Sequence, residues 1–199
     1  MRKPFLAFIA MVNVIAATAQ ENQVKYPYKK KQAVGFQFTL HDFQTAIDLK
    51  NTSISRVLQE KQWHSLSSMS SGLAITYMKG LTDNFDFSAR LGISSVAYPI
   101  PGKSTSQGGV LWESDVNLHY KFFTDRYWVA PFLTAGAGAS KWTGYYGAYI
   151  PLGVGLQLNV NDEGYVLLNA DYRVAVTTAT TASHFFYSLG VAIPIPDKK

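Results

Sequence analysis

Residues 110–122 alternate between two kinds of side chain, and this alternation constrains the fold more than any other feature of the chain. The even positions are apolar or aromatic except for Ser114, whereas the odd positions from 113 to 121 are all polar or charged. Side chains of a β-strand point alternately to its two faces, so the segment is predicted to be a strand with one apolar and one charged face. Hairpins of such strands are typical of a membrane-spanning β-barrel.

The same alternation recurs along the chain and predicts eight strands. They are expected at residues 34–43, 71–80, 84–97, 109–122, 127–139, 146–160, 164–177 and 184–194. The uncharged stretch 142–161 is long enough to cross a bilayer as a helix, but its glycines and alternating aliphatic residues favour a strand with small residues facing inward. Strand 127–139 is ambiguous because Phe132 and Leu133 have opposite parities. We therefore expect an all-β, eight-stranded antiparallel up-and-down transmembrane barrel.

The connections between these strands fall into two classes. Three are short and rich in turn-forming residues, at 81–84, 124–126 and 161–164, and the others are more polar and mostly longer. Outer-membrane barrels have tight periplasmic turns and longer external loops, so both chain ends are expected in the periplasm. Each short turn holds an aspartate followed closely by aromatics, which we expect to form a girdle at the inner membrane surface: Phe85, Tyr127, Trp128 and Tyr165.

The N-terminus has the features of an export signal. Arg2 and Lys3 precede an apolar run at 5–15 and the small-residue pattern 17–19, so residues 1–19 are predicted to be a cleaved signal peptide. A membrane-anchoring helix is the alternative, but the apolar run is too short and contains Asn13. Residues 20–33, which include several lysines, are expected to be a solvated periplasmic lead-in, and 34–199 to form the barrel.

Composition narrows the class of protein further. Without Arg2 and Lys3 the chain has 16 basic and 13 acidic residues, so its net charge falls from +5 to +3, too little to indicate a nucleic-acid partner. Charged residues make up only 16% of the chain, against roughly 25% in an average soluble domain, which suits an exterior that faces lipid. The absence of cysteine excludes disulfides and thiolate metal sites.

The alternation assigns a face to most strand residues. The outward set is Val34, Phe36, Phe38, Leu40, Leu73, Ile75, Tyr77, Phe85, Phe87, Ala89, Leu91, Ile93, Val166, Leu168, Ala170, Tyr172, Val174 and Val176. The inward set includes Gln37, Thr39, Thr76, Asp86, Ser88, Arg90, Gly92, Asn169, Asp171 and Arg173. We therefore expect an aliphatic band outside and a polar interior.

Eight residues are predicted to form an ion-pair network in the lumen, with His41 nearby. They are Asp86, Arg90, Glu113, Asp115, His119, Lys121, Asp171 and Arg173. Acid–base catalysis by paired carboxylates and a histidine is the alternative reading. The network is favoured because an eight-stranded barrel is only wide enough for its own side chains, and buried charges have to be paired. A filled lumen also argues against a wide pore.

No residue pattern indicates a cofactor, a metal site or a catalytic centre. The four histidines, His41, His64, His119 and His184, lack metal-ligand spacing. A serine–histidine hydrolase that uses His64 or His184 stays open as an alternative, although no G-x-S-x-G motif supports it. The glycines at 136–138 lack the remainder of a nucleotide-binding motif, so no nucleotide is expected.

The segment 44–71 is the largest insertion between strands. Residues 53–61 have an apolar stripe at helical spacing with Ser53 as a plausible N-cap, which predicts a short helix in the first external loop. A lid over the barrel rim is the favoured interpretation, and an epitope for an unknown surface partner is the alternative.

Three segments carry a family resemblance. Residues 131–139, 151–159 and 187–192 resemble strand motifs of the small outer-membrane β-barrel proteins of Bacteroidota. The resemblance covers nearly the whole mature chain and is to the barrel domain of the outer membrane protein A type, without the peptidoglycan-binding domain that some relatives append. It implies an architecture, and it implies no catalytic residues because the family shares none.

The sequence thus predicts an integral barrel of the cell outer membrane, porin-like in architecture, with a structural or surface-interaction role and no enzymatic activity. Its expected partners are outer-membrane lipids, the barrel insertion machinery during biogenesis and, through 44–71, an unknown surface partner. Three alternatives remain: an outer-membrane lipid-modifying enzyme, a secretion-accessory barrel, and a soluble lipocalin-like barrel with its apolar face turned inward.

Overall fold

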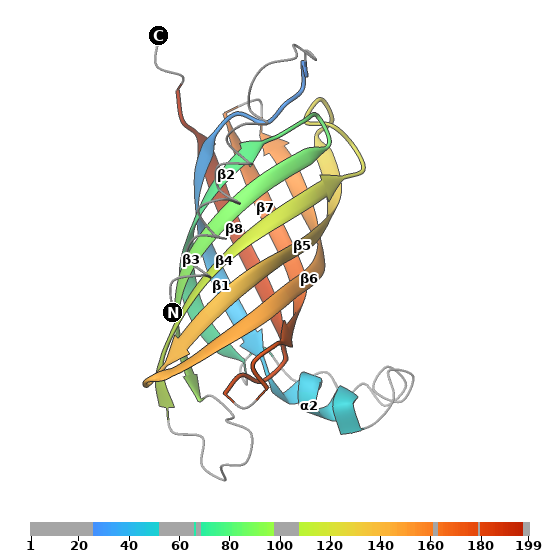
Figure 1. The fold of residues 1–199 in the computed structure, drawn as a ribbon. Helices are drawn as coiled ribbons and strands as arrows, with labels where there is room; N and C mark the ends of the chain where they lie inside the picture. Colours follow the sequence, from blue (N-terminus) through green and yellow to red (C-terminus); the bar gives the residue numbers. More distant parts are fainter. Residues whose placement is uncertain are drawn as a thin grey trace, which may run out of the picture.

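The eight predicted strands form one closed barrel (Figure 1). The computed structural model describes residues 26–51, 66, 69–97, 108–160, 163–178 and 180–196. Within them the strands are β1 (Ala33–Asp42), β2 (Ser70–Gly80), β3 (Phe85–Ala97), β4 (Gly108–Lys121), β5 (Val129–Trp142), β6 (Tyr145–Val160), β7 (Gly164–Ala175) and β8 (His184–Pro194). The predicted fold class is confirmed, with strand boundaries shifted by at most three residues.

Each strand pairs antiparallel with the next, and β8 closes the barrel on β1. Following the register from Gln37 in the two directions around the barrel leads to Ser140 on β5 by one path and to Ala130 by the other. The offset of ten residues between these two positions is the stagger of the closed sheet. With strands about 4.8 Å apart and a rise of about 3.3 Å per residue, this stagger gives a tilt of about 40° and a backbone radius of about 8 Å.

The two faces of the wall have the polarity that the alternation predicts. The predicted outward side chains are exposed or partly exposed, and most of the predicted inward polar side chains are buried. On β5, the ambiguous strand, the structure points Phe132 into the lumen and Leu133 outward. Many of the most exposed apolar side chains lie on the strands themselves: Phe36, Phe38, Ile75, Leu91, Trp112, Val154, Val191 and Ile193. The molecule therefore carries its apolar surface outside and its charges inside.

The two ends of the barrel differ. The turn end holds the three short turns, the start of β1 and the end of β8, and the loop end holds the other four connections. Three loop-end connections span several residues, but β5 and β6 run on to a two-residue turn, Thr143 and Gly144, whose φ angles are 41° and 95°. The expectation of a longer connection there was wrong: the alternation continues past residue 139, so longer strands replace the loop.

The connection after β1 holds the one helix among the described residues, α2 (Gln44–Asn51). The Asp42 carboxylate accepts a hydrogen bond from the Thr45 amide at 2.9 Å and so caps its first turn. A helix in this connection was predicted at 53–61, which lies outside the described residues, and the observed helix begins directly after β1. No helix in the described part of the chain is long and apolar enough to cross a membrane.

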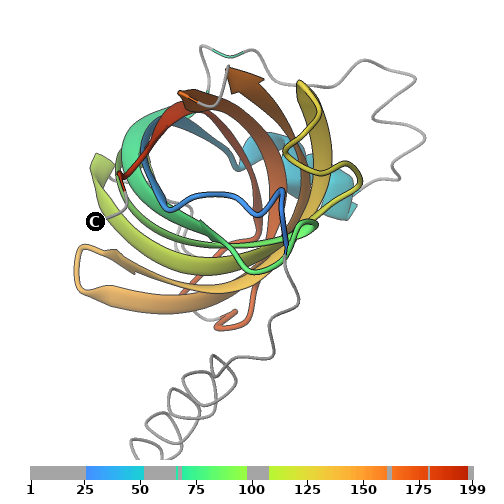
Figure 2. The same ribbon diagram turned by 90° about the horizontal axis from the view of Figure 1, so that it is seen from above.

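The segment before β1 departs at one residue, Lys30, from the solvated lead-in that the sequence suggested. Residues 26–32 lie across the opening at the turn end (Figure 2). The Lys30 carbonyl accepts a hydrogen bond from the Gly80 amide at 3.1 Å, and the Lys30 side chain is buried in the barrel. Consecutive lysines suggest a solvated segment, but the structure separates them: Lys29 and Lys31 are exposed, and Lys30 turns inward.

Aromatic side chains gather outside the barrel near the turn end. Phe85 packs on Tyr120 with ring centroids 5.1 Å apart, and Tyr127 and Trp128 are exposed. Three of the four predicted girdle residues thus lie on the outer surface. Tyr165 was assigned wrongly: it follows the parity of the inward face of β7 and is buried, with the Lys30 ammonium 5.0 Å from its ring centroid.

Candidate functional site in the barrel lumen

All eight residues of the predicted lumen network have side chains inside the barrel and are buried. They come from three strands: Asp86 and Arg90 from β3, Glu113, Asp115, His119 and Lys121 from β4, and Asp171 and Arg173 from β7. Because β3 and β4 are neighbours and β7 lies across the lumen from them, the charges span the interior. They divide into a central cluster and a second cluster near the turn end.

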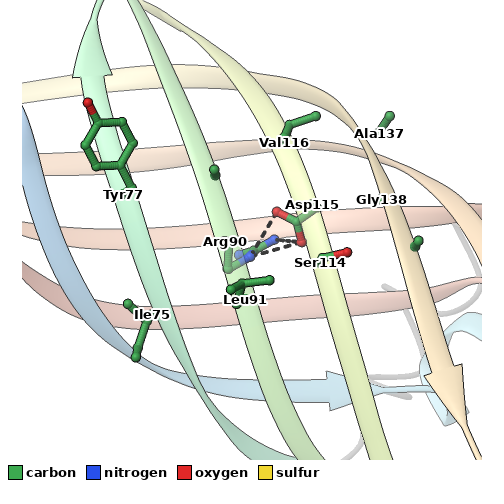
Figure 3. A pocket seen from close by; sticks show the side chains of 11 residues that line it. Ile75, Tyr77, Arg90, Leu91, Ser114, Asp115, Val116, Ala137 and Gly138 are labelled. Carbon is green, nitrogen blue, oxygen red and sulfur yellow. Dashed lines mark hydrogen bonds and ion pairs between the residues drawn. The ribbon is translucent and has the colours of Figure 1, made fainter. Parts of the chain in front are cut away.

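Asp115 is the hub of the central cluster. Its carboxylate accepts three hydrogen bonds from Arg90 at 2.9–3.1 Å (Figure 3), and one from Arg173 at 3.3 Å. The Tyr149 hydroxyl donates to the same carboxylate at 3.0 Å, and the Asn117 amide donates at 2.6 Å. Donors on β3, β4, β6 and β7 therefore converge on one carboxylate, as a buried charge requires.

The two arginines of the central cluster share a further set of contacts. Arg173 also forms an ion pair with Glu113, and Arg90 lies 3.8 Å from the Asp171 carboxylate. Their guanidinium carbons lie 3.6 Å and 4.2 Å from the centroid of the Phe186 ring on β8. Stacking on an aromatic face suits the planar guanidinium, so Phe186 supports both cations at the centre of the barrel.

The second cluster closes the turn end. The Lys121 ammonium lies 3.1 Å from Asp86 and 2.6 Å from Asp125. Lys30 donates to Asp86 at 2.5 Å and to the side-chain oxygen of Gln157. Burial lowers the pKa of Lys30 below its usual range, an effect that the Asp86 carboxylate opposes. Without Lys30, Lys121 would be the one cation next to both Asp86 and Asp125 in this cluster. The N-terminal segment thus supplies a second cation for Asp86.

His119 lies between these clusters and is held by hydroxyl groups. Its ring nitrogens lie 2.8 Å from the Ser88 hydroxyl and 2.9 Å from the Thr134 hydroxyl. The structure therefore places His119 in the lumen, as predicted, but gives it neutral partners. The Phe132 ring contacts it edge-on, with centroids 5.0 Å apart.

The lumen is packed with side chains. One cavity near its middle has a volume of about 20 Å³, room for about one water molecule. Four side-chain oxygens line this cavity and have no hydrogen-bond partner among the described residues: those of Gln37, Thr76, Asn117 and Asp171. Their placement around a cavity of this size fits one ordered water molecule.

A third cluster lies under the loop end. The His41 Nδ1 lies 3.2 Å from the His184 Nε2, and the His41 Nε2 lies 2.9 Å from the Ser94 hydroxyl and 3.5 Å from Glu113. A serine next to a histidine has the form of an activated nucleophile. Ser94 is only 4% exposed, however, so an acyl group from outside has no access to its oxygen.

The serine–histidine pairs considered from the sequence, at His64 and His184, are not found as solvent-exposed pairs in the described part of the chain. His184 is buried, and the adjacent Ser183 hydroxyl accepts a hydrogen bond from the Ala175 amide at 3.0 Å rather than contacting an imidazole. His64 lies outside the described residues. The described part of the chain therefore contains no serine–histidine pair open to solvent among these candidates.

Several lumen residues were not predicted from the sequence. Lys30 lies outside the alternating strands, and Tyr149 looked like one more aromatic in an uncharged stretch. Parity within β6 was the available signal for Tyr149, since it shares the inward face with Gln157. The contact between His41 and His184 had no local signal, because 143 positions separate them.

The outer wall has shallow apolar depressions where small side chains face outward. One, of about 550 Å³, is lined by Ala89, Ser114, Ala137 and Ala139 and bordered by Ile75 and Leu91 (Figure 3). Another, of about 620 Å³, lies over β6, β7, β8 and β1 and includes Phe38, Leu168 and Leu189. Both are open to the surroundings of the barrel, and both have a mainly apolar lining.

Solved structures with a similar fold are small outer-membrane barrels. The N-terminal β-barrel domain of Pseudomonas aeruginosa OprF is 14% identical, with a TM-score of 0.50 over 83% of this chain and 98% of that one. Neisserial surface protein A (NspA) is also 14% identical, with a TM-score of 0.51 over 84% of this chain and 99% of that one. No family model matches the sequence. No curated protein matches it either. The likeness therefore establishes the fold, an eight-stranded barrel of the outer-membrane type.

Proposed function

We propose that this chain is an integral protein of the cell outer membrane with a structural or surface-interaction role. The observation that carries the proposal is the polarity of the closed wall: aliphatic side chains cover the outside, while the charges and their partners fill the inside. In water this arrangement would expose a continuous apolar belt, whereas in a bilayer every backbone polar group is paired within the barrel and the belt contacts acyl chains.

The dimensions of the wall support insertion. The shortest strand, β1, has 10 residues, which is sufficient for a tilted strand to cross the hydrocarbon layer. Exposed aromatic side chains lie near both ends of the wall, with Tyr127 and Trp128 at the turn end and Trp112 and Tyr146 nearer the loop end. Aromatic girdles at the two interfaces are a feature of membrane barrels. The apolar depressions over small side chains suit acyl chains of the proposed lipid partners.

A passive role suits the interior better than transport or catalysis. A barrel with a backbone radius of about 8 Å leaves room for its own side chains, and here they form paired clusters from one end to the other. Interaction with other molecules then falls to the loop end, where α2 extends away from the wall (Figure 1). We propose segment 44–71 as the contact for a surface partner, and we expect no nucleic-acid ligand.

The route to the membrane forms part of the proposal. Residues 1–19 would direct export and be removed, and the barrel insertion machinery would fold 34–199 into the outer membrane, with the turn end and residues 20–33 in the periplasm. The resemblance of three strand motifs to barrels of Bacteroidota supports placing the chain in that group of small outer-membrane barrels. A role as a secretion-accessory barrel would use the same architecture and location.

The soluble lipocalin-like alternative has the opposite polarity. It requires an apolar interior around a ligand, whereas the described lumen holds charged clusters and a cavity of about 20 Å³. An enzyme that modifies lipid needs a nucleophile within reach of its substrate, and the two described serines whose hydroxyls contact a histidine, Ser88 and Ser94, are both buried.

Membrane fractionation followed by gel electrophoresis tests the proposal. Full-length chain expressed with its signal should appear in the outer-membrane fraction and migrate differently before and after boiling, because a folded barrel resists detergent. A soluble periplasmic protein with no difference in migration would contradict it. Protease added to intact cells should cut within 44–71 and leave the turn end protected, whereas cleavage near residue 26 alone would reverse the orientation.

A further inference from the structure

Three buried side chains from different parts of the sequence meet beneath the loop end. His41 is near the end of β1, Glu113 lies on β4, and His184 begins β8. One ligand atom from each lies within 4.8 Å of the other two. The β1–β8 pairing brings the histidines together, and the stagger of the barrel places Glu113 beside them from the other side of β1.

His184 presents a lone pair to this cluster. Its Nδ1 lies 3.0 Å from the Ala182 carbonyl oxygen, which only accepts hydrogen bonds, so Nδ1 must carry the proton. In the neutral ring Nε2 is then unprotonated, and Nε2 is the atom that faces His41 at 3.2 Å. A backbone carbonyl behind the distal nitrogen is the usual arrangement for a metal-binding histidine, because it fixes both the tautomer and the ring orientation.

Glu113 is oriented in a comparable way. Arg173 binds its Oε1, which leaves Oε2 directed at the His41 Nε2 at 3.5 Å. An outer partner that holds one carboxylate oxygen and leaves the other available is common around metal ligands. Two imidazoles and one carboxylate are a ligand set that zinc uses in proteins, with a fourth position for water.

The charge balance of the interior favours an additional cation. Five carboxylates and four cations are buried among the described residues: Asp42, Asp86, Glu113, Asp115 and Asp171 against Lys30, Arg90, Lys121 and Arg173. Asp125, whose side chain is 12% exposed, adds a sixth carboxylate. Asp42 follows His41 directly, and its Oδ2 has no hydrogen-bond partner among the described residues. A divalent ion would offset this excess of negative charge.

An apolar layer separates the cluster from the loop end. The Phe43 ring lies 4.4 Å from the His184 ring, centroid to centroid, and Phe43 belongs to a buried group with Val96, Leu111 and Trp142. Such a layer limits access of water and strengthens the attraction between a cation and its ligands.

We propose that His41, Glu113 and His184 bind one divalent transition-metal ion, with zinc favoured by the ligand types. Tetrahedral zinc holds its ligand atoms about 3.4 Å apart at bond lengths of about 2.1 Å. The three ligand atoms lie within 4.8 Å of one another, so binding requires the His41 and Glu113 side chains to move closer to the ion. The ion ties β1 and β8 to β4 and stabilises the base of the 43–69 connection. The role of the ion is structural, and this site is additional to the membrane function proposed above.

Metal content after refolding tests this site, because the apolar layer would slow the entry of metal into folded protein. Full-length chain purified in detergent is unfolded in urea with chelator and refolded into phosphatidylcholine vesicles with zinc chloride, and bound zinc is measured after desalting. We expect about one zinc ion per chain. His184→Gln and His41→Gln should bind zinc at least about 100-fold more weakly, since loss of an outer partner alone costs about 10- to 100-fold. His119→Gln is the matched control, a buried lumen histidine bonded to hydroxyls, and should keep the zinc.

Equal zinc content in His184→Gln and wild type, or equal loss in His119→Gln, would overturn the site. If the ligand variants fail to show the unboiled folded band, the cobalt spectrum of the wild-type protein decides. Four-coordinate cobalt gives intense visible bands, which we expect after refolding with cobalt chloride. Weak bands of an octahedral ion, or no bound cobalt, would refute the proposal.

Discussion

Asp115→Asn is the substitution that most directly probes the packed lumen. Asp115 is 4% exposed, and its carboxylate accepts hydrogen bonds from Arg90, Arg173, Tyr149 and Asn117. An amide at this position keeps the volume but removes the negative charge and turns an N–H group toward the same donors. Two buried guanidinium groups are then left with Glu113 and Asp171 as their remaining anions. Breaking a buried ion pair from one side costs about 3–5 kcal/mol, so we expect a loss of this size.

Equilibrium urea unfolding in lipid vesicles measures the effect, with tryptophan emission and unboiled gel mobility as independent probes. A loss of about 3 kcal/mol lowers the folded-to-unfolded ratio by about 100-fold. Asp83→Asn is the control, because Asp83 accepts its hydrogen bond from the Tyr28 amide at an exposed position, and it should cost about 1 kcal/mol or less. A change below about 1 kcal/mol for Asp115→Asn would refute the reasoning, as would an equal loss in the control.

Four further substitutions, in three tests, probe other parts of the structure. The strand tilt places the exposed Leu118 about level with the middle of β1. Leu118→Lys should therefore lower the free energy of unfolding in vesicles by about 2–4 kcal/mol, whereas Val160→Lys at the turn end should lower it by about 0–1 kcal/mol. Equal losses in urea titrations would contradict membrane insertion. Thr143→Asn should raise unfolding stability by about 0.5–1 kcal/mol, because a β-branched residue at a φ of 41° is strained and asparagine tolerates that region, and an unchanged urea midpoint would argue against strain in this turn. Lys30→Gln should lower the free energy of unfolding by about 1–3 kcal/mol, because it leaves Asp86 with one cation. It should also make residues 26–32 easier to cleave by protease in the refolded protein. An unaltered cleavage rate would contradict the conclusion that Lys30 holds this segment in the lumen.

The face of each side chain was largely predictable, because it depends only on parity within a strand. Phe36 and Arg90 are typical: each position follows from its neighbours two residues away, and the structure places them outside and inside as expected. The prediction failed where parity was absent or misapplied. Lys30 precedes the first strand, and Tyr165 was assigned from its distance to a turn although its parity on β7 is inward.

The turn between β5 and β6 shows a different limit of sequence-based prediction. Residues 140–145 contain serine, threonine and glycine, so they read as a loop, yet Ser140 and Trp142 continue the inward face of β5. Cross-strand pairing with β6 extends the ladder to Trp142 and Tyr145 and confines the turn to two residues. The strand propensity of individual residues is a weak guide where pairing with a neighbouring strand determines how far a strand extends.

The class of fold, the eight strands and the two faces of the wall therefore followed from the sequence alone, because a period of two is a local property of the chain. Which inward side chains meet followed only from the closed barrel. That outcome depends on the ten-residue stagger, which accumulates over all eight registers and only exists once β8 pairs with β1. Asp115 became a hub for four strands, and His41, Glu113 and His184 became neighbours, through closure of the barrel rather than through any spacing in the sequence.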